Sequence, residues 1–421
     1  MFNKDKVIYL IFLIAIAATS LYAVFKNLPI VIGSFRFFWG PFVLITILFI
    51  KPAVYLKKPV IIVLIYGIFM LGVLQYSLWQ YMPDWTRLGL LEDFYNLLIF
   101  SAMFTYLYLN QKYIIWARIG KMAFFFILIT IIGTNIALNI DPLIVRNSAS
   151  VLDPYQNSLA KLTGAAGYGY AQAFVLIIPI LVYHIKFRKQ FIFKRWILII
   201  ILIAIFITLV RAQVFANILA AIAIFMLAFF GAKRARKSFL PISLITIVLI
   251  AIPSSIYADM LYSLGSYFDP SSVIHYKLTD FAMFIQNPEM TGTTGAGGRA
   301  ERYPMLFEAL LARPIFGDAS YSSVYDIGAG GHLYWMNKLA QWGILGFLFF
   351  IFILYQLYKK IRSLFDDGFG FYYFLSVSAF ILMGLMKNIA GREPFLMLII
   401  IIPGLYFLPL LENKRPTKFF R

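Results

Sequence analysis

The chain has 421 residues, of which 62% are hydrophobic and 13% charged, with no cysteine and a formal net charge of +19. Its mean hydropathy of +0.83 excludes an ordinary soluble domain, in which about half of the residues are apolar and about a quarter charged. The absence of cysteine excludes disulfide-bonded loops and thiol chemistry. The composition therefore indicates an all-α, polytopic integral membrane protein.

Apolar runs long enough to cross a bilayer recur along the chain. Runs of about 17–25 apolar residues are typical of membrane-spanning helices. The first run is too long for the hydrophobic part of a signal peptide and has no small-residue cleavage site, so we expect it to be a span. We predict about twelve transmembrane helices, at residues 7–25, 30–50, 60–79, 94–109, 121–139, 168–185, 196–210, 213–230, 239–257, 342–358, 370–386 and 395–410.

The basic residues alternate with these predicted spans. Most of the 37 lysines and arginines fall in every second gap. The positive-inside rule places such gaps in the cytoplasm, so both termini are expected there. The positive charge is then a signal of membrane topology, and it does not indicate nucleic-acid binding. The basic gaps are residues 4–6, 51–58, 112–121, 186–195, 233–237, 359–362 and 414–421.

Two gaps on the opposite, outward side are long, at residues 139–167 and 258–341. We therefore divide the chain into residues 1–257 with nine transmembrane helices, residues 258–341 as one large extracytoplasmic loop, and residues 342–421 with three more helices and a basic cytoplasmic tail. Loops above about 15 residues are uncommon unless they have a function, so we expect the site here. Within the large loop the sequence predicts amphipathic helices at residues 258–268 and 272–285, which suit a membrane interface, and a helix at residues 299–312.

Arg211 lies between two apolar runs, in ITLVRAQVFA. An arginine costs about 2–3 kcal/mol at the centre of a membrane helix and less near its end, and charges kept there usually mark a site or a pathway. We predict a functional role for Arg211. The alternative is an arginine whose side chain reaches the lipid headgroups.

Arg299 follows the glycine-rich GAGG and begins the predicted helix at residues 299–312. Backbone N–H groups at a helix N-terminus, together with a guanidinium, form a seat for an anion. Arg302 comes one turn later and can share that face. The alternative is a solvated helix with Arg302 paired to its acidic neighbours. The segment lacks the Gly-Lys-Ser/Thr ending of a nucleotide-binding P-loop.

His332 opens the stretch GHLYWMNKLAQWGILG, which leads into the apolar run FLFFIFIL. Asn337, Lys338 and Gln341 follow within three helical turns. An imidazole with a pKa near 6.5 can accept a hydroxyl proton at neutral pH, so His332 is a candidate general base. The alternative is a histidine with only a structural hydrogen bond.

Metal chemistry is not expected, because the sequence has no HExxH motif and no aspartate-rich cluster. Glu92 and Asp93 are the one adjacent acidic pair in an outward gap. Stabilisation of a helix N-terminus is the favoured role for them. A metal-dependent lipid-linked-sugar transferase that uses these two acids stays an alternative. We expect no cofactor.

Three segments resemble the O-antigen polymerase and O-antigen ligase superfamily of bacterial envelope polysaccharide assembly. The chain departs from the family pattern at Val210, where a serine is usual, and at Leu333, where an asparagine is frequent, while Tyr303 is the aromatic residue after the second arginine. The resemblance covers about residues 160–360, and LVRAQVFA fits it as well. The three segments are LTGAAGYGYAQAFVLIIPI, GGRAERYPMLFEALLARPIFGDA with its P-x-x-G pattern, and the His332 stretch with G-I-L-G.

The resemblance implies inverting, metal-independent glycan transfer from an undecaprenyl-diphosphate donor at the periplasmic face of a bacterial inner membrane. His332 would activate the acceptor hydroxyl, and Arg211 and Arg299 would hold the departing diphosphate. Its expected partners are the lipid-linked donor and acceptor, membrane lipids and a chain-length regulator protein, with no nucleic acid. The substrate-binding residues are expected to be Arg302, Lys338, Arg146, Asn337 and Tyr303.

The favoured interpretation is a polymerase of lipid-linked oligosaccharide repeat units, and two alternatives stay open beside the metal-dependent transferase. The first is a ligase that moves finished glycan to a lipid A core or a protein, because the donor chemistry is the same. The second is a twelve-span transporter or lipid-linked-oligosaccharide flippase, with Arg36 as its pathway charge. The large outer loop and the few charges inside spans count against this second class.

Overall fold

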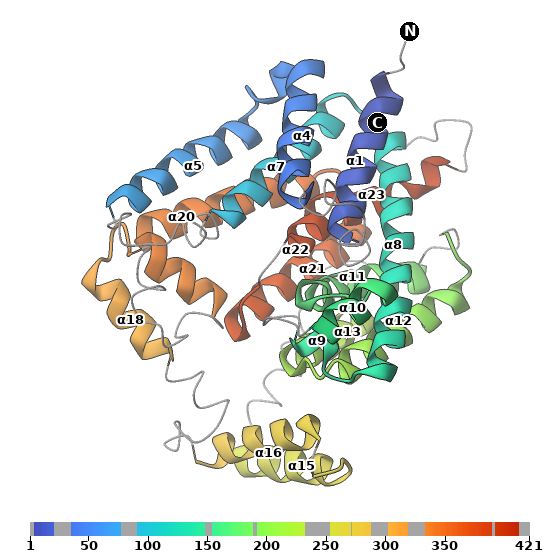
Figure 1. Ribbon diagram of the computed structural model, residues 1–421, viewed down its shortest axis with the longest axis vertical. Coiled ribbons are helices and arrows are strands. Elements are labelled where there is room, and N and C mark those ends of the chain that lie inside the picture. The colour runs from blue at the N-terminus through green and yellow to red at the C-terminus, as the bar shows by residue number, and fades with distance from the viewer. Residues whose placement is uncertain are drawn as a thin grey trace.

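The computed structural model describes residues 4–20, 35–76, 91–147, 154–187, 192–231, 253–270, 272–287, 302–318, 333–389 and 392–411. Every regular element in these residues is a helix, as the sequence predicts (Figure 1). The first half contains α1 (Lys4–Ser20), α4 (Phe35–Ile50), η1 (Pro52–Val54), α5 (Lys58–Tyr76), α7 (Glu92–Leu109), α8 (Tyr113–Ile140), α9 (Ile144–Asn147), α10 (Pro154–Thr163), α11 (Tyr168–Phe187), α12 (Arg195–Arg211) and α13 (Phe215–Phe230). The second half contains α15 (Ser254–Ser266), α16 (Val273–Gln286), α18 (Arg302–Ala312), α20 (Tyr334–Arg362), α21 (Asp367–Met386), α22 (Glu393–Leu396), η4 (Met397–Ile401), α23 (Ile402–Tyr406) and η5 (Leu408–Leu411).

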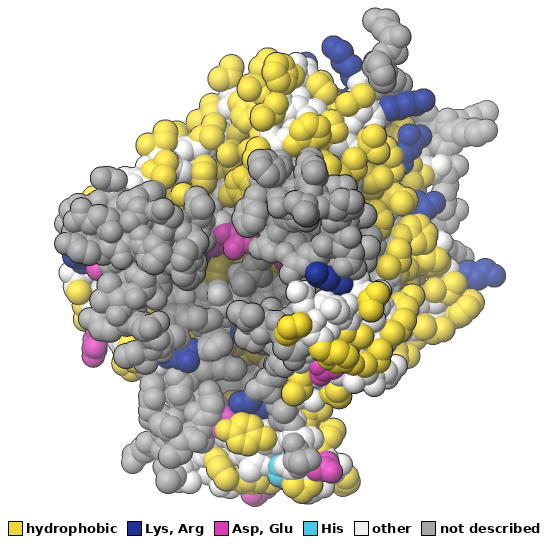
Figure 2. Space-filling view, in the orientation of Figure 1, with side chains coloured by type: hydrophobic (Ala, Val, Ile, Leu, Met, Phe, Trp, Pro, Cys, Tyr) yellow, Lys and Arg dark blue, Asp and Glu magenta, His cyan; other side chains and the backbone are white. Residues whose placement is uncertain are grey.

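Four of the described helices are long and apolar enough to cross a membrane: Tyr113–Ile140, Gly169–Phe187, Tyr334–Arg362 and Asp367–Met386. Shorter apolar helices accompany them, so the chain is a membrane protein by length and composition of its helices. The prediction of twelve spans is not confirmed, and most of residues 239–257 lies outside the described residues. Hydrophobic side chains cover broad areas of the upper part of the face in Figure 2, and Phe49 is 83% exposed, as expected of helices that face lipid.

Described residues of the predicted basic gaps mark one end of the helix bundle. Lys112 forms an ion pair of 2.8 Å with Asp5, which joins the start of α1 to the α7–α8 connection. Lys186 donates to the carbonyl of Gly231 at 2.9 Å, and so ties the end of α11 to the end of α13. We call this end the basic end, and the other end of the same helices the opposite end. The C-terminal ends of α8, α12 and α21 lie at the opposite end.

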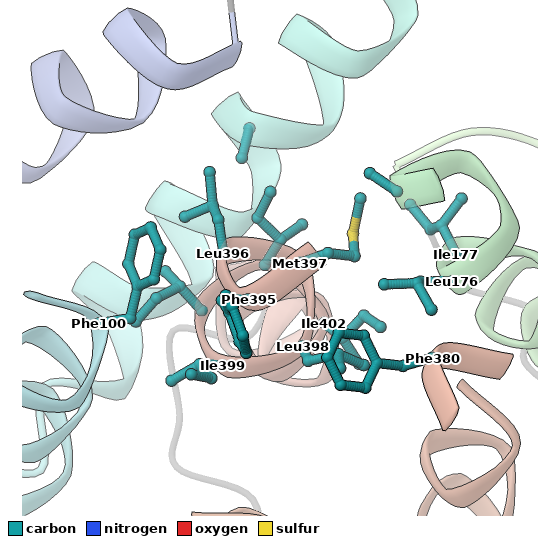
Figure 3. Packing of buried hydrophobic residues seen from close by; sticks show 14 of the residues in the cluster. Phe100, Leu176, Ile177, Phe380, Phe395, Leu396, Met397, Leu398, Ile399 and Ile402 are labelled. Carbon is teal, nitrogen blue, oxygen red and sulfur yellow. The ribbon is translucent and has the colours of Figure 1, made fainter. Parts of the chain in front are cut away.

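The segment α22–η4–α23 lies at the centre of the bundle. Every side chain in residues 394–408 is buried, and a helix that is apolar all round is expected in such a position. Figure 3 shows Phe395 and Leu398 of this segment among side chains of α7, α11 and α21, including Phe100, Leu176 and Phe380. The last apolar run in the sequence therefore forms the core against which earlier helices pack.

A π-helical turn, η4, interrupts this central segment. The N–H of Ile402 bonds to the carbonyl of Met397, five residues earlier, and Pro403 has no N–H to donate. Side chains of neighbouring helices supply donors to the turn: the Tyr373 hydroxyl donates to the Leu398 carbonyl at 3.3 Å, and the Trp116 indole donates to the Ile400 carbonyl at 2.8 Å. The central helix is thereby tied to α21 and to α8.

The helix α20 is two helices joined at Gly343, which has a φ of 65° and a ψ of −177°. The segment that follows α18 is inserted at this break. The N–H of Ile344 donates to the Pro314 carbonyl at 2.8 Å, and the N–H of Asp318 donates to the Ala340 carbonyl at 2.9 Å. Irregular backbone within an apolar helix needs such partners, because lipid supplies none.

The break brings together the two glycine motifs that the sequence analysis singled out. A Cβ on Gly343 would lie 2.3 Å from the Ile315 carbonyl oxygen, and a Cβ on Gly317, with φ of 71°, would lie 2.3 Å from the Gly343 nitrogen. The P-I-F-G segment ending at Gly317 and the G-I-L-G segment starting at Gly343 therefore interlock, backbone against backbone. Glycine is needed at both positions by conformation and by space.

The helices predicted inside the large loop are confirmed at α15, α16 and α18. The first two pack against each other as a hairpin, at the lower end of Figure 1, and His275 joins them through its Nδ1, 2.9 Å from the Gly265 carbonyl. Two features differ from the prediction. The long gap at residues 139–167 contains two helices, α9 and α10, and α20 begins at Tyr334, before the predicted span.

Candidate functional site

Several helix ends converge at the opposite end of the bundle, around the last turn of α21. The Tyr303 hydroxyl, from the start of α18, donates to the Leu385 carbonyl at 2.6 Å. The Trp335 indole, from the start of α20, donates to the Ile381 carbonyl at 2.9 Å. Leu385 is among the last four residues of α21, whose carbonyls have no partner within the helix. The two bonds together fix the starts of α18 and α20 onto α21.

Lys338, Asp93 and Tyr334 form a compact polar cluster beside this junction. The Lys338 ammonium lies 2.6 Å from a carboxylate oxygen of Asp93, and the two side chains are 12% and 11% exposed. The Tyr334 hydroxyl donates to the same carboxylate oxygen at 2.9 Å. The carboxylate thus has both an ionic and a neutral partner, as a nearly buried charge requires. This cluster ties α7 to α20.

The same contacts bear on two predictions from the sequence. Asp93 lies in the first turn of α7, where a negative charge stabilises the helix as expected. An ammonium in direct contact with its carboxylate disfavours a metal cation at that place, which weakens the metal-dependent alternative. The substrate-binding role of Lys338 stays a prediction, and its charge is already compensated by Asp93.

Arg211 is the last residue of α12 and is partly exposed at the opposite end. Its guanidinium donates to the side-chain oxygen of Asn139, near the end of α8. One turn below, Asn135 donates to the Thr208 hydroxyl at 2.6 Å. These two contacts fasten α12 to α8 and hold the guanidinium at the protein surface. A cation at a helix C-terminus is favourable, and the guanidinium keeps further donors for a ligand.

Lys387 is a site residue that the sequence analysis did not select. It follows the last turn of α21 and is 4% exposed. Its ammonium donates to the side-chain oxygen of Asn217 at 2.8 Å, and Gln172 donates to the carbonyl of the next residue, Asn388, at 2.8 Å. The sequence signal was a lysine in a short gap that should lack positive charge. The burial of that lysine among carboxamides could not be read from the sequence.

The α12–α13 turn connects Arg211 to this buried lysine. Only residues 212–214 separate the end of α12 from the start of α13, and Asn217 lies in the first turn of α13. Arg211 and Lys387 therefore belong to the same region of the opposite end. Figure 1 shows α11 and α13 next to each other. Two cationic groups flank this turn, at the ends of apolar helices.

The other predicted site residues differ in what the structure describes. Arg299 and His332 lie outside the described residues, as does the side chain of Arg146 on α9. Arg302 begins α18 and is partly buried, and Asn337 lies in the first turn of α20. Burial raises the pKa of the Tyr303 hydroxyl, so this group remains a hydrogen-bond donor at neutral pH.

Comparisons with known proteins identify no relative. No family model matches the chain, and no curated protein matches it. Among the described residues no three histidine, aspartate or glutamate side chains form a group that could hold a metal ion.

Proposed function

We propose that the protein is a membrane glycosyltransferase that polymerises undecaprenyl-diphosphate-linked oligosaccharide repeat units at the outer face of a bacterial inner membrane. The observation that carries the proposal is that two cations lie next to the α12–α13 turn: Arg211 ends α12 and contacts Asn139, and Lys387 donates to Asn217 in the first turn of α13. A lipid-linked sugar has an apolar tail, a diphosphate and hydroxyl groups. At the opposite end, apolar helices suit the tail, cationic side chains suit the diphosphate, and carboxamides suit the hydroxyl groups.

The reaction places definite demands on the side chains. The acceptor sugar hydroxyl oxygen attacks the anomeric carbon of the donor, and the bond from that carbon to the diphosphate oxygen breaks. The leaving diphosphate takes the electron pair, and a base takes the hydroxyl proton. Cations fixed beside the leaving oxygen lower the barrier, because negative charge develops there. Arg211 suits this role, with Arg299 as its expected partner and His332 as the expected base.

The interlocked glycines support the same assignment. Gly317 ends the segment that carries Arg302 at its start, and Gly343 lies in the helix that begins two residues after His332. Because these segments contact each other at the α20 break, groups on both are held in a fixed relation. Such fixed placement of reacting groups is what transfer between two bound substrates requires.

The test uses purified full-length protein in lipid nanodiscs with undecaprenyl-diphosphate-linked repeat units, and the products are separated on a gel. A ladder of lengthening products supports a polymerase. A single shift that needs an added lipid A core or protein acceptor supports the ligase, and loss of activity with EDTA supports the metal-dependent transferase. Substrate that stays unchanged, yet crosses the bilayer in proteoliposomes, supports a transporter and overturns the proposal.

Arg211→Ala is expected to lower the initial rate of polymerisation by about 100-fold or more, because a fixed charge at the leaving group is lost. Arg211→Lys should keep part of the rate, since it retains the charge but not the planar fork of donors. Arg195→Ala is the matched control, because Arg195 is an exposed arginine at the other end of the same helix. Equal rates for Arg211→Ala and Arg195→Ala would contradict the assignment.

A further inference from the structure

Three carboxamides at the opposite end each keep one buried polar atom without a hydrogen-bond partner among the described residues. These atoms are Oε1 of Gln172, Oε1 of Gln213 and Nδ2 of Asn217. Gln172 and Asn217 are fully buried. Buried polar atoms are nearly always paired in native proteins, so unpaired ones indicate an occupant that is absent from the protein chain itself.

The position of these carboxamides is fixed by neighbouring backbone and by Lys387. Gln172 donates its N–H to the Asn388 carbonyl at 2.8 Å, and the Asn217 oxygen accepts from Lys387 at 2.8 Å. Asn217 and Gln172 thus lie on either side of the chain at residues 387–388. Gln213 lies in the α12–α13 connection, four residues before Asn217, and Arg211 comes two residues before Gln213.

Gln213 adopts a backbone conformation that a glutamine rarely adopts. Its φ of 55° is in the left-handed region, where glycine would be under less strain. The chain turns here from α12 to α13, with the Gln213 N–H bonded to the Val210 carbonyl at 3.0 Å. A glutamine in this place carries a strain that a glycine would relieve, and its carboxamide oxygen is buried without a partner.

The chemistry of the unpaired atoms indicates the class of ligand. Two are acceptors and one is a donor, whereas a phosphate offers only acceptors at neutral pH. A sugar hydroxyl both donates and accepts a hydrogen bond, so it can satisfy a carboxamide oxygen and a carboxamide N–H at once. The adjacent Arg211 guanidinium and Lys387 ammonium suit the phosphate to which that sugar is attached.

We propose that residues 211–217, together with Gln172, form a carbohydrate subsite that binds hydroxyl groups of the sugar next to the diphosphate. Gln213 and Asn217 contact the sugar, and Lys387 positions Asn217. This inference rests on the proposed function and adds the residues that bind the first sugar. It assigns the recognition of carbohydrate to the α12–α13 turn and Gln172.

The test is Gln213→Gly, which removes the carboxamide and relieves the backbone strain. Full-length protein in nanodiscs is titrated with two probes, an undecaprenyl-diphosphate-linked repeat unit and sugar-free undecaprenyl diphosphate. We expect the variant to keep or raise the melting temperature, to bind the glycosylated probe at least about tenfold more weakly, and to bind the sugar-free probe as the wild type does. Gln111→Gly is the matched control, because Gln111 has a φ of 49° in the α7–α8 connection at the basic end.

Each outcome of the titration has a definite meaning. Wild-type affinity of Gln213→Gly for the glycosylated probe would overturn the subsite and assign the unpaired atoms to buried water. An equal loss of affinity for both probes would also overturn it. The α12–α13 turn would then contribute to diphosphate binding or to folding, and not to recognition of the sugar. If the wild type binds neither probe, the proposed function itself fails, and this result is distinct because it appears before any variant is compared.

Discussion

Gly343 determines the shape of α20, because no other residue type can both take its φ of 65° and leave room for the inserted segment. Gly343→Ala is expected to destabilise the protein by roughly 2–4 kcal/mol, from backbone strain and from the clash with the Ile315 carbonyl. The measurement is the thermal unfolding midpoint in detergent, together with polymerisation activity.

The matched control for this substitution is Gly72→Ala in α5. A Cβ at Gly72 meets nothing within 4 Å, and alanine stabilises a helix interior by about 0.5–1 kcal/mol relative to glycine. The two variants should therefore shift the midpoint in opposite directions. A Gly343→Ala protein as stable as Gly72→Ala would show that the break in α20 does not depend on glycine.

The ion pair between Lys338 and Asp93 permits a second test at the scale of single residues. Lys338→Met leaves the Asp93 carboxylate with the Tyr334 hydroxyl as its remaining described partner, and removal of one member of such a pair costs about 3 kcal/mol. The double variant Lys338→Met with Asp93→Asn removes both charges and keeps an acceptor for Tyr334. We expect this double variant to unfold at a higher temperature than Lys338→Met alone, whereas additive losses would contradict the pairing.

At the scale of helices, η4 depends on donors from its neighbours. Trp116→Phe removes the indole N–H that bonds to the Ile400 carbonyl, and a buried carbonyl left without a donor costs about 1–3 kcal/mol. Trp196→Phe, at the exposed start of α12, should change stability by no more than about 0.5 kcal/mol. Unfolding of both variants in the same detergent compares them. Equal stability would mean that the π turn needs no outside donor.

Hydropathy located most helices well, and it failed where tertiary contacts override it. Predicted spans at residues 60–79 and 370–386 correspond to α5 and α21. The start of α20 was missed because Tyr334 to Gln341 is a mixed polar stretch, whose helical form depends on contacts with Asp93 and α21. The break at Gly343 was also missed, since its cause is a segment about 25 residues away in sequence that supplies the backbone partners.

At the scale of the whole molecule, the alternation of basic gaps makes a direct prediction about membrane topology. Because the chain has no cysteine, a single introduced thiol reports its own position. A membrane-impermeant maleimide added to cells with a permeabilised outer membrane should label Ser158→Cys, on α10 at the opposite end, and should not label Ser363→Cys, just after α20 at the basic end. Both residues are exposed. Labelling of Ser363→Cys alone would invert the predicted topology.

The sequence predicted the chemical type of the candidate site residues, but only some of the residues themselves. The charge inside an apolar stretch drew attention to Arg211, which lies partly exposed at a helix end, and its functional role stays a prediction. Lys387 was not selected, because its burial beside Asn217 cannot be read from the sequence. Lys338 was selected from its neighbours in sequence, and its closest partner, Asp93, comes from a helix more than 200 residues earlier.

The central place of α22, η4 and α23 has a consequence for how the molecule is made. Ribosomes extend a chain from its N-terminus, so the helices that surround this segment leave the translocon before their shared centre exists. Until residues 394–408 are inserted, Phe100, Leu176 and Phe380 therefore face lipid or one another. Assembly of the bundle is then a late event, which follows the synthesis of residues 394–408.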